Sequence, residues 1–341
     1  MAVTVVVGGQ FGSEGKGKVA YLIAREQGVA AAVRVGGPNS GHTAIQNGHV
    51  YRLQALPTAA LLPDVDVVLP AGTYISIDTL RSEMQSVALD PARLHVDPNA
   101  MIITESLRKK EQLDEALVGI GSTLSGTGAA VVARIERSHV TLAKDVPDLK
   151  EFISDTNLVL RSHIARGERV LVEGTQGLGL SVYHSPYYPY CTSRDTSAAG
   201  VLSEAGLSPL DVDQVVLVLR AFPIRVAGPS GPLPREIDWS EVARISGDSE
   251  PLAEYTTVTR KLRRVALFDP VVPNKAISVN RPTQVVLNHV DYFDASCRST
   301  HAVSGRAARH VAEIASQLSA PLTHVGLGPD HLLRLGASGN D

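Results

Sequence analysis

The first part of the chain restricts the fold more than any other segment. Val3–Val7 is an unbroken run of β-branched residues, which is typical of a strand covered on both faces in a parallel sheet. A glycine-rich turn, Gly8–Gly15, follows, and Lys16–Gln27 has a helical pattern. A strand, a tight glycine turn and a helix in this order predict an α/β fold that opens on a phosphate-loop-like turn.

The same strand–loop–helix order recurs along the chain. Alternating short strands and helices favour a mainly parallel, doubly wound central sheet flanked by helices. No internal repeat or low-complexity linker divides the sequence, so we expect residues 1–341 to form a single large domain. The expected strands are Val3–Val7, Ala30–Val35, Val65–Leu69, Arg169–Glu173, Gln214–Leu219, Gln284–Leu287 and Thr323–Val325, and the expected helices are Lys16–Gln27, Thr79–Val87, Leu149–Ala165 and Arg306–Leu318.

Composition excludes several functional classes. Lys and Arg number 32 and Asp and Glu 35, so the net charge of −3 leaves no basic surplus for a general nucleic-acid binder. No run of about 18 apolar residues suggests a membrane span, and no signal-peptide pattern is present. Two cysteines are too few for a disulfide framework or a structural zinc site. We therefore expect a cytoplasmic protein without nucleic-acid or membrane partners.

The glycine-rich turn is the strongest chemical signal. Backbone N–H groups at the start of a helix favour a phosphate, and Lys16 and Lys18 add positive charge. The segment departs from the strict phosphate-loop pattern, because neither lysine is followed by the Ser or Thr that binds magnesium. The alternative is a glycine-rich turn without a ligand.

Further polar clusters follow other predicted strands. The carboxyl edge of an open α/β sheet is where ligands bind. Each cluster also has a simpler interpretation, as an exposed histidine, a packed loop of tyrosines, a connecting loop or a solvated basic segment. The clusters are Gly36–Thr43, Gly121–Gly128, Glu173–Gly177, Tyr187–Ser193, Thr256–Arg264, Val285–Asp291 and Gly326–Asp330.

Taken together and in this order, these motifs resemble the adenylosuccinate synthetase family. The resemblance spans nearly the whole chain and includes the first loop, the Gly41-His42-Thr43 turn, the Glu173–Gly177 segment, the Tyr190–Ser193 segment and the arginine-rich loop. The family joins aspartate to the 6-position of a purine nucleotide after a nucleoside triphosphate has phosphorylated the 6-oxygen. The resemblance therefore implies a ligase that forms a carbon–nitrogen bond, uses Mg2+ and forms a homodimer.

One departure suggests the subtype. The aspartate of the family's first loop is Ser13 in this chain. Ser13 and the compact length are similar to the viral, bacteriophage branch of the family, which acts on dGMP on the way to diaminopurine DNA. A short side chain leaves room for the 2-amino group of guanine, and a hydroxyl can both donate and accept. The implied substrates are dGMP, L-aspartate and ATP or dATP, and the implied location is the host cytoplasm.

The resemblance also assigns roles, motif by motif. The implied catalytic residues are Ser13, Lys16 and His42, with His42 as a general acid. The implied contacts to the donor nucleotide are Gly12, Glu14, Gly15, Lys16, Gly17, Gly41, His42, Thr43, Asn288, Asp291, Gly328 and Pro329. Those to dGMP are Ser13, Asn39, Ser122, Thr123, Arg134, Gln176, Thr192 and Arg260, with Arg134 lent across the dimer. Thr257, Val258, Thr259 and Arg263 would bind aspartate, and Ser13 and Gly41 would hold Mg2+.

Two alternatives remain. One is an ordinary adenylosuccinate synthetase that uses IMP and GTP and tolerates Ser13. The other is an inactive homologue that binds purine nucleotides as a sensor, because the family's carboxylate is missing. Retention of Lys16, His42, Gln176 and the cationic loop argues against the sensor.

Overall fold

A computed structural model describes residues 2–138, 140–248, 252–255 and 261–336. Its centre is a nine-stranded sheet with the order β16-β15-β14-β10-β1-β9-β2-β5-β7. Neighbouring strands pair in parallel, except β15 with β16. The strands are β1 (Val3–Gly8), β2 (Ala31–Arg34), β5 (Asp66–Leu69), β7 (Leu94–Val96), β9 (Val170–Glu173), β10 (Val212–Arg220), β14 (Gln284–Asn288), β15 (His324–Leu327) and β16 (His331–Arg334).

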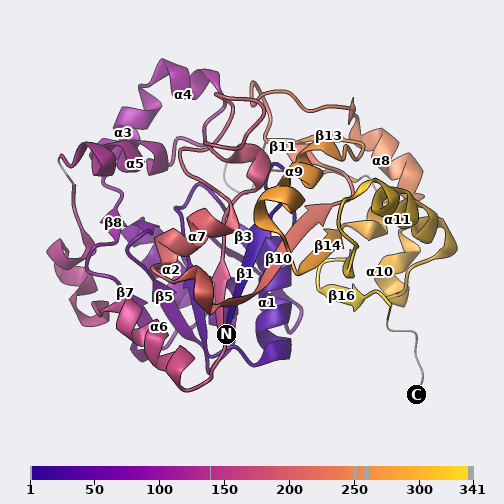
Figure 1. The fold of residues 1–341 in the computed structure, drawn as a ribbon. Helices are drawn as coiled ribbons and strands as arrows, with labels where there is room; N and C mark the ends of the chain where they lie inside the picture. Colours follow the sequence, from indigo (N-terminus) through magenta and orange to yellow (C-terminus); the bar gives the residue numbers. More distant parts are fainter. Residues whose placement is uncertain (1, 139, 249–251, 256–260, 337–341) are drawn as a thin grey trace.

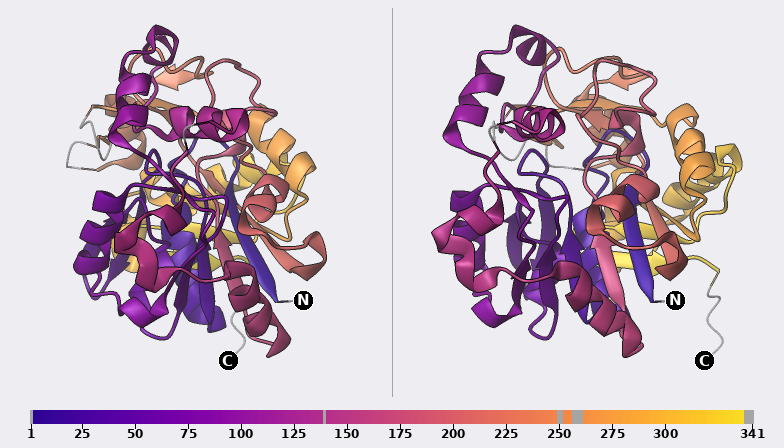
Figure 2. Two further views of the ribbon diagram at one scale, coloured as in Figure 1. Left: turned by 90° about the vertical axis from the view of Figure 1, so that its left-hand side faces the viewer. Right: turned by 60° about the vertical axis from the view of Figure 1, so that its left-hand side comes forward.

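Helices cover both faces of this sheet, as Figures 1 and 2 show. On β1, Val6 packs with Val19 and Ile23 of one helix, while Val5 and Val7 belong to the core on the other face. The predicted doubly wound α/β class is therefore confirmed. The helices are α1 (Lys16–Gln27), α2 (Ile77–Ser86), α3 (Glu105–Gln112), α4 (Glu115–Gly119), α5 (Thr127–Glu136), α6 (Thr156–Ala165), α7 (Ala198–Ala205), α8 (Trp239–Ser246), α9 (Val271–Asn280), α10 (Ser296–Thr300) and α11 (Gly305–Gln317).

The strand order explains where a ligand can enter. The chain passes from β1 to β2 and on to β5 and β7, then returns through β9 to β10 and β14, so β1 and β9 lie at the reversal. Ligands of open sheets bind beyond the carboxyl ends of strands at such a reversal.

The α3–α5 group lies beyond that end, in the upper part of Figure 1, and three small sheets accompany the central sheet. The small sheets are formed by β3 (His42–Gln46) with β4 (His49–Leu53), β6 (Tyr74–Ile75) with β8 (Met101–Ile102), and β11 (Ile224–Arg225), β13 (Arg264–Ala266) and β12 (Glu236–Ile237).

One predicted helix is wrong in extent. The segment Leu149–Ala165 is not continuous: Pro147–Phe152 forms a short 3-10 helix and α6 begins only at Thr156. Ile153 bridges to Val96 of β7, and the Asp155 side chain accepts a hydrogen bond from Leu158 N–H at 3.0 Å. The pairing of Ile153 with β7 ends the 3-10 helix Pro147–Phe152, and the Asp155 cap starts α6. The other predicted strands and helices are present with ends shifted by a few residues.

No helix in the described part of the chain has both the length and the apolar character needed to cross a membrane.

The central strands should dominate stability. Leu171 on β9 is fully buried, whereas Leu210 is 84% exposed. We expect Leu171→Ala to lower the free energy of unfolding by about 3 kcal/mol, because it removes buried methyl groups and leaves a cavity. Leu210→Ala is the matched control and should change it by less than about 0.5 kcal/mol. Urea denaturation measures both, and equal values would contradict this description of the core.

Candidate active site

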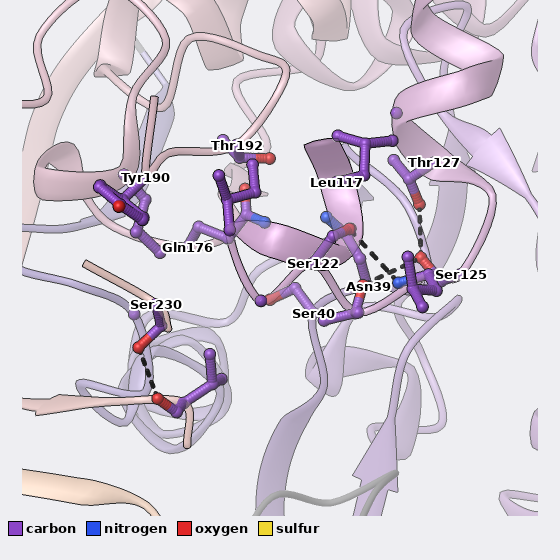
Figure 3. Close-up of a pocket in the computed structure, with 18 of the residues that line it drawn as sticks. Asn39, Ser40, Leu117, Ser122, Ser125, Thr127, Gln176, Tyr190, Thr192 and Ser230 are labelled. Atoms are coloured by element: carbon purple, nitrogen blue, oxygen red, sulfur yellow. Dashed lines mark hydrogen bonds between the residues drawn. The ribbon is translucent and has the colours of Figure 1, made fainter. Parts of the chain in front are cut away.

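A cavity with a volume of about 410 Å³ lies beyond the carboxyl ends of the central strands. The first loop contributes Gly12 and Ser13, and the turn after β2 contributes Asn39–Gly41. The segment before α5, the Tyr190–Ser193 segment and the loop after β11 complete its walls. Figure 3 shows Asn39, Ser122 and Ser125 on one side and Gln176, Tyr190 and Thr192 on the other. Segments far apart in sequence thus share one polar cavity.

The first loop is filled by its own carboxylate. Glu14 Oε1 accepts hydrogen bonds from Gln10 N–H at 3.1 Å and from Gly12 N–H at 2.8 Å. Its Oε2 lies 2.6 Å from Lys16 Nζ, and both side chains are buried. The loop therefore already holds an anion among its N–H groups, and Lys16 faces that anion and not the cavity.

Gly17 allows the helix after this loop to approach the His42–Thr43 turn closely. A Cβ atom at Gly17 would lie 2.8 Å from His42 Cβ and 2.9 Å from Thr43 N. Any larger residue would push α1 away from β3. The glycine after Lys16 thus brings the first loop and His42 together.

His42 is held by a buried ion pair. Arg34 Nη1 lies 3.0 Å from Glu173 Oε1, and these residues are register partners at the ends of β2 and β9. His42 Nδ1 contacts both members of this ion pair. It lies 2.5 Å from Arg34 Nη1 and forms a shorter hydrogen bond with Glu173 Oε1. Thr58 completes the group, because its N–H and its hydroxyl each donate to Glu173 Oε2 at 2.8 Å.

This environment keeps the imidazole neutral near pH 7. Burial, followed by the positive charge of Arg34, lowers the pKa of His42 to about 3. Its Nδ1 touches a donor and an acceptor, so these contacts accommodate either neutral tautomer. The other ring nitrogen, Nε2, is buried without a hydrogen-bond partner among the described residues.

Two further buried polar atoms at the cavity lack partners within the described residues. They are Oδ1 of Asn39 and Oε1 of Gln176, and both residues line the cavity. A buried acceptor without a partner costs free energy, so such atoms indicate where a ligand would donate hydrogen bonds.

The Ser13 side of the cavity is cationic. Arg220 is fully buried, donates from Nη1 to Ser13 O at 2.9 Å and forms an ion pair with Glu254 at 2.5 Å. Arg263 Nη1 donates to the Ser13 hydroxyl. Ser13 itself has a φ of 57°, in the left-handed region. Two arginines thus fix both the backbone and the side chain of Ser13.

Of the predicted donor-nucleotide residues outside the first loop and the Gly41–Thr43 turn, Asn288 and Asp291 are buried, whereas Gly328 is half-buried and Pro329 is exposed. Lys18 Nζ donates to Gly328 O at 3.0 Å, and burial lowers the pKa of Lys18 to about 8. Asn288 Nδ2 donates to Glu14 O at 2.8 Å, behind the loop and away from the cavity. Asp291 Oδ2 accepts from Arg298 Nε at 2.7 Å.

The structure brings nine of the twenty predicted site residues that it describes into the lining of the cavity. Residues that line it are Gly12, Ser13, Asn39, Gly41, Ser122, Thr123, Gln176, Thr192 and Arg263. Those outside its lining are Glu14, Gly15, Lys16, Gly17, His42, Thr43, Arg134, Asn288, Asp291, Gly328 and Pro329. Thr257, Val258, Thr259 and Arg260 lie outside the described residues. The roles of all these residues stay predictions.

Sequence reasoning missed several residues that build the site. Arg34 and Arg220 end strands β2 and β10, and a charged residue that directly follows a run of apolar strand residues is the signal that could have found them. The wall from Val226 to Ser230 follows β11, where Gly228-Pro229 marks a loop. Glu111 also lines the cavity, but nothing in its local sequence distinguishes it from other helix-surface glutamates.

The fit of Mg2+ depends on its phosphate ligands. The Gly41 carbonyl and the Ser13 hydroxyl are neutral oxygen donors, and the Ser13 hydroxyl faces Arg263. Within the described residues no cluster of three or more His, Cys, Asp or Glu side chains suits a metal. Mg2+ commonly takes few protein ligands and completes its shell with phosphate and water. Gly41 and Ser13 therefore offer at most two neutral oxygens, and most of the ligands of an Mg2+ bound with a triphosphate would come from phosphate and water.

The chain matches the family model described as adenylosuccinate synthetase over residues 5–147 and 141–296. It is 35% identical to the adenylosuccinate synthetase of Methanocaldococcus jannaschii over 337 residues, covering 97% of this chain and 95% of the relative. The adenylosuccinate synthetase of Archaeoglobus fulgidus is 32% identical over 335 residues, which cover 97% of this chain and 96% of the relative.

Two solved structures share the fold. One is the succinoaminodeoxyadenylate synthetase of cyanophage S-2L, bound to dGMP and to dATP as an energy donor. The TM-score is 0.80 and the sequence identity is 30%, and the match covers 98% of this chain and 95% of the cyanophage chain. The other is the fully ligated adenylosuccinate synthetase of Plasmodium falciparum, with a TM-score of 0.85 over 98% and 100%. At 20% identity the second likeness concerns the fold alone.

The Arg220–Glu254 pair should make stability depend on pH. Burial raises the pKa of Glu254, but Arg220, His289 and Arg263 outweigh it and hold the pKa at about 2, below the ordinary 4.5. A depressed carboxyl pKa stabilises the fold above about pH 4.5, and this contribution is lost as the pH falls through about 2. Glu254→Gln should therefore lower the free energy of unfolding by about 3 kcal/mol at pH 7. The difference from the unsubstituted protein should shrink towards pH 2.

Urea denaturation at a series of pH values measures this difference. Glu241→Gln is the control, because Glu241 pairs with Arg244 in solvent, and it should show no such pH-dependent difference. A Glu254→Gln effect that is constant between pH 7 and pH 3 would contradict the ion pair.

Proposed function

The chain belongs to the adenylosuccinate synthetase family, and from that premise we propose that it is a ligase joining L-aspartate to C6 of dGMP. ATP or dATP drives the reaction. The product is 2-amino-2′-deoxy-N6-succinyl-AMP, a precursor of diaminopurine DNA. The proposal places the enzyme in the cytoplasm of a host cell, as one domain in a homodimer.

The identity of residue 13 carries this proposal. Ser13 lies at the cavity, and both its hydroxyl and its carbonyl face arginines. A hydroxyl is shorter than a carboxylate and uncharged, so it leaves room beside N1 of a purine for the 2-amino group of guanine. The 30% identity to the cyanophage enzyme, whose structure holds dGMP and dATP, supports the same substrate class.

The proposed reaction has two steps. In the first, O6 of the guanine base attacks the γ-phosphorus of the donor, the N1 proton passes to solvent, and the nucleoside diphosphate leaves. In the second, the amine of aspartate attacks C6 and inorganic phosphate leaves with the former O6. Phosphoryl transfer of this kind depends on positioning and on charge stabilisation.

Residues that line the cavity and residues next to its lining suit these steps. Nε2 of His42 is buried and unpartnered within the described residues, so a ligand oxygen can pair with it. The amide of Gln176 and the side chain of Asn39 would hold the acceptor nucleotide. Lys16 would contribute positive charge at the first loop, with Glu14 fixing its position. Mg2+, when bound with the donor, would offset the charge of the phosphates.

An adenine donor fits Asp291 better than a guanine donor. Guanine recognition by a carboxylate uses both oxygens, one for N1–H and one for the 2-amino group. In this chain Arg298 Nε already donates to Oδ2 of Asp291, and the neighbouring position is His289. We therefore propose ATP or dATP, with Asn288 supporting the first loop from behind.

The placement of Arg134 supports the proposed homodimer. Its Nη1 donates to Asn99 O at 3.0 Å, and the side chain does not line the cavity of its own chain. If Arg134 binds the acceptor nucleotide, it does so in a second copy.

An ordinary adenylosuccinate synthetase is the second candidate. The identity of 35% to the archaeal enzyme favours it, because that relative exceeds the cyanophage enzyme in identity. In that case IMP and GTP would be the substrates. An inactive nucleotide sensor is the third candidate and would follow from the missing carboxylate at position 13.

A substrate panel tests the proposal. The purified protein is given dGMP, GMP or IMP, each with aspartate, Mg2+ and either ATP or GTP, and mass spectrometry detects the succinylated nucleotide. We expect product from dGMP with ATP. Product from IMP alone would support the ordinary synthetase, and binding without product from any base would support the sensor.

Ser13→Asp provides the matched variant. The left-handed φ of Ser13 is one that aspartate tolerates, so the backbone should be kept. The new carboxylate takes the space beside N1 and attracts Arg263. We expect the ratio of kcat/KM for dGMP to that for IMP to fall at least tenfold. An unchanged ratio would remove Ser13 as the residue that selects the base.

His42 provides a test of the chemistry. His42→Asn keeps a polar side chain but loses the ring nitrogen, Nε2, that faces no protein partner within the described residues. We expect kcat to fall at least a hundredfold, in line with the loss of a charge-stabilising donor, while the Kd for dGMP changes less than threefold. Steady-state kinetics and calorimetry measure the two quantities. Turnover equal to that of the unsubstituted enzyme would contradict the role of His42.

A further inference from the structure

A buried carboxylate occupies the N-terminus of α5 at the wall of the cavity. Glu111, from α3, is 3% exposed. Its Oε2 accepts from Gly126 N–H at 2.5 Å, and its Oε1 accepts from Gly128 N–H at 2.5 Å and Ala129 N–H at 3.2 Å. The first N–H groups of a helix have no partner within the helix, so this carboxylate satisfies three donors at once.

Glycines make this close approach possible. A Cβ atom at Gly128 would lie 2.8 Å from Glu111 Oε1, so a side chain there would collide with the carboxylate. Gly126 has a φ of 87°, which residues with side chains rarely adopt. Leu107 of α3 packs with Ala129, Ala130 and Ala133 of α5 in one apolar cluster. Glu111 and this cluster together fix the start of α5 against α3.

The same helix start carries a row of hydroxyls. Ser122, Thr123, Ser125 and Thr127 all line the cavity. Figure 3 labels Ser122, Ser125 and Thr127 of this row. Within the row, Thr123 Oγ1 donates to Ser125 Oγ at 3.3 Å, and the Ser125 and Thr127 hydroxyls lie 3.1 Å apart. Thr127 also reaches the turn after β2, because a Cβ atom at Gly37 would lie 2.6 Å from its Oγ1. The hydroxyl row therefore faces the turn that carries Asn39.

These contacts decide where an anion can bind. A helix N-terminus normally attracts a phosphate, but here a carboxylate already takes the N–H groups of α5. A second anion at the same groups would be repelled by Glu111. The hydroxyl row beside it offers donors without a negative charge, so it is the better place for the phosphate of a nucleotide.

We propose that Glu111 is the positioning residue for the monophosphate end of the acceptor nucleotide. It occupies the N-terminal N–H groups of α5 and so fixes the Ser122–Thr127 hydroxyl row in the geometry that receives the phosphate. The inference rests on the proposed function only in taking a nucleoside monophosphate as the acceptor substrate. It holds equally for dGMP and for IMP.

Glu111→Gln tests this role. The amide keeps the size of the side chain but brings an N–H2 group against backbone N–H donors, so the helix start should shift. We expect the KM for dGMP to rise at least tenfold, while kcat and the KM values for ATP and aspartate change less than twofold. The inhibition constant of deoxyguanosine, which lacks the phosphate, should change less than threefold.

Two further variants act as controls. Glu111→Asp keeps the charge on a shorter side chain and should recover part of the lost dGMP affinity. Asp155→Asn removes the charge of a carboxylate that accepts from Leu158 N–H in α6, remote from the cavity, and should leave every KM unchanged. Thermal unfolding and circular dichroism confirm that each variant is folded.

The outcomes separate the two proposals. An unchanged or lower KM for dGMP in Glu111→Gln overturns the positioning role, as does an equal loss for deoxyguanosine. If the unsubstituted enzyme uses IMP in place of dGMP, the same comparison with IMP and inosine tests Glu111, and only the base assignment fails. If the unsubstituted protein binds no nucleoside monophosphate, both proposals fail.

Discussion

The site depends on a carboxylate buried between two strand ends. Glu173 is fully buried, and an isolated buried charge is costly unless it is paired and hydrogen-bonded. Its partners come from three segments: Arg34 at the end of β2, His42 at the start of β3 and Thr58 in the segment after β4. Because Arg34 and Glu173 are register partners, the parallel pairing of β2 with β9 creates the ion pair. The pair then fixes His42 beside the first loop.

Other inward-facing carboxylates support the site in the same way. Glu14 holds the N–H groups of the first loop and Lys16, Glu111 holds the start of α5, and Glu83 accepts from the N–H groups of Gln54, Ala55 and Leu56. Each loop is therefore fixed by an internal anion before any nucleotide binds. Such preorganisation reduces the entropy lost when phosphates and bases are positioned.

The sequence predicted the fold well because its signal is local. The β-branched run of β1, the glycine turn and the helix after it are read from neighbouring residues, and α1 has the predicted ends, Lys16–Gln27. The prediction of one continuous helix over Leu149–Ala165 was wrong because a β-bridge between Ile153 and Val96 interrupts the segment. The local sequence around Ile153 does not indicate a contact with a strand that lies more than fifty residues earlier in the chain.

For the site, the sequence determined which residue types stand at the ends of strands and in glycine loops, and these residues predict a phosphorylated ligand there. It also places a serine, Ser13, where the resemblance implies an aspartate, and the proposed choice of base rests on that difference. Only the tertiary structure decided that Lys16 faces Glu14, that Arg263 meets Ser13, and that Glu111 occupies the start of α5. These contacts join residues whose partners lie across loops and helices, so strand register and packing set them, and no local pattern encodes them.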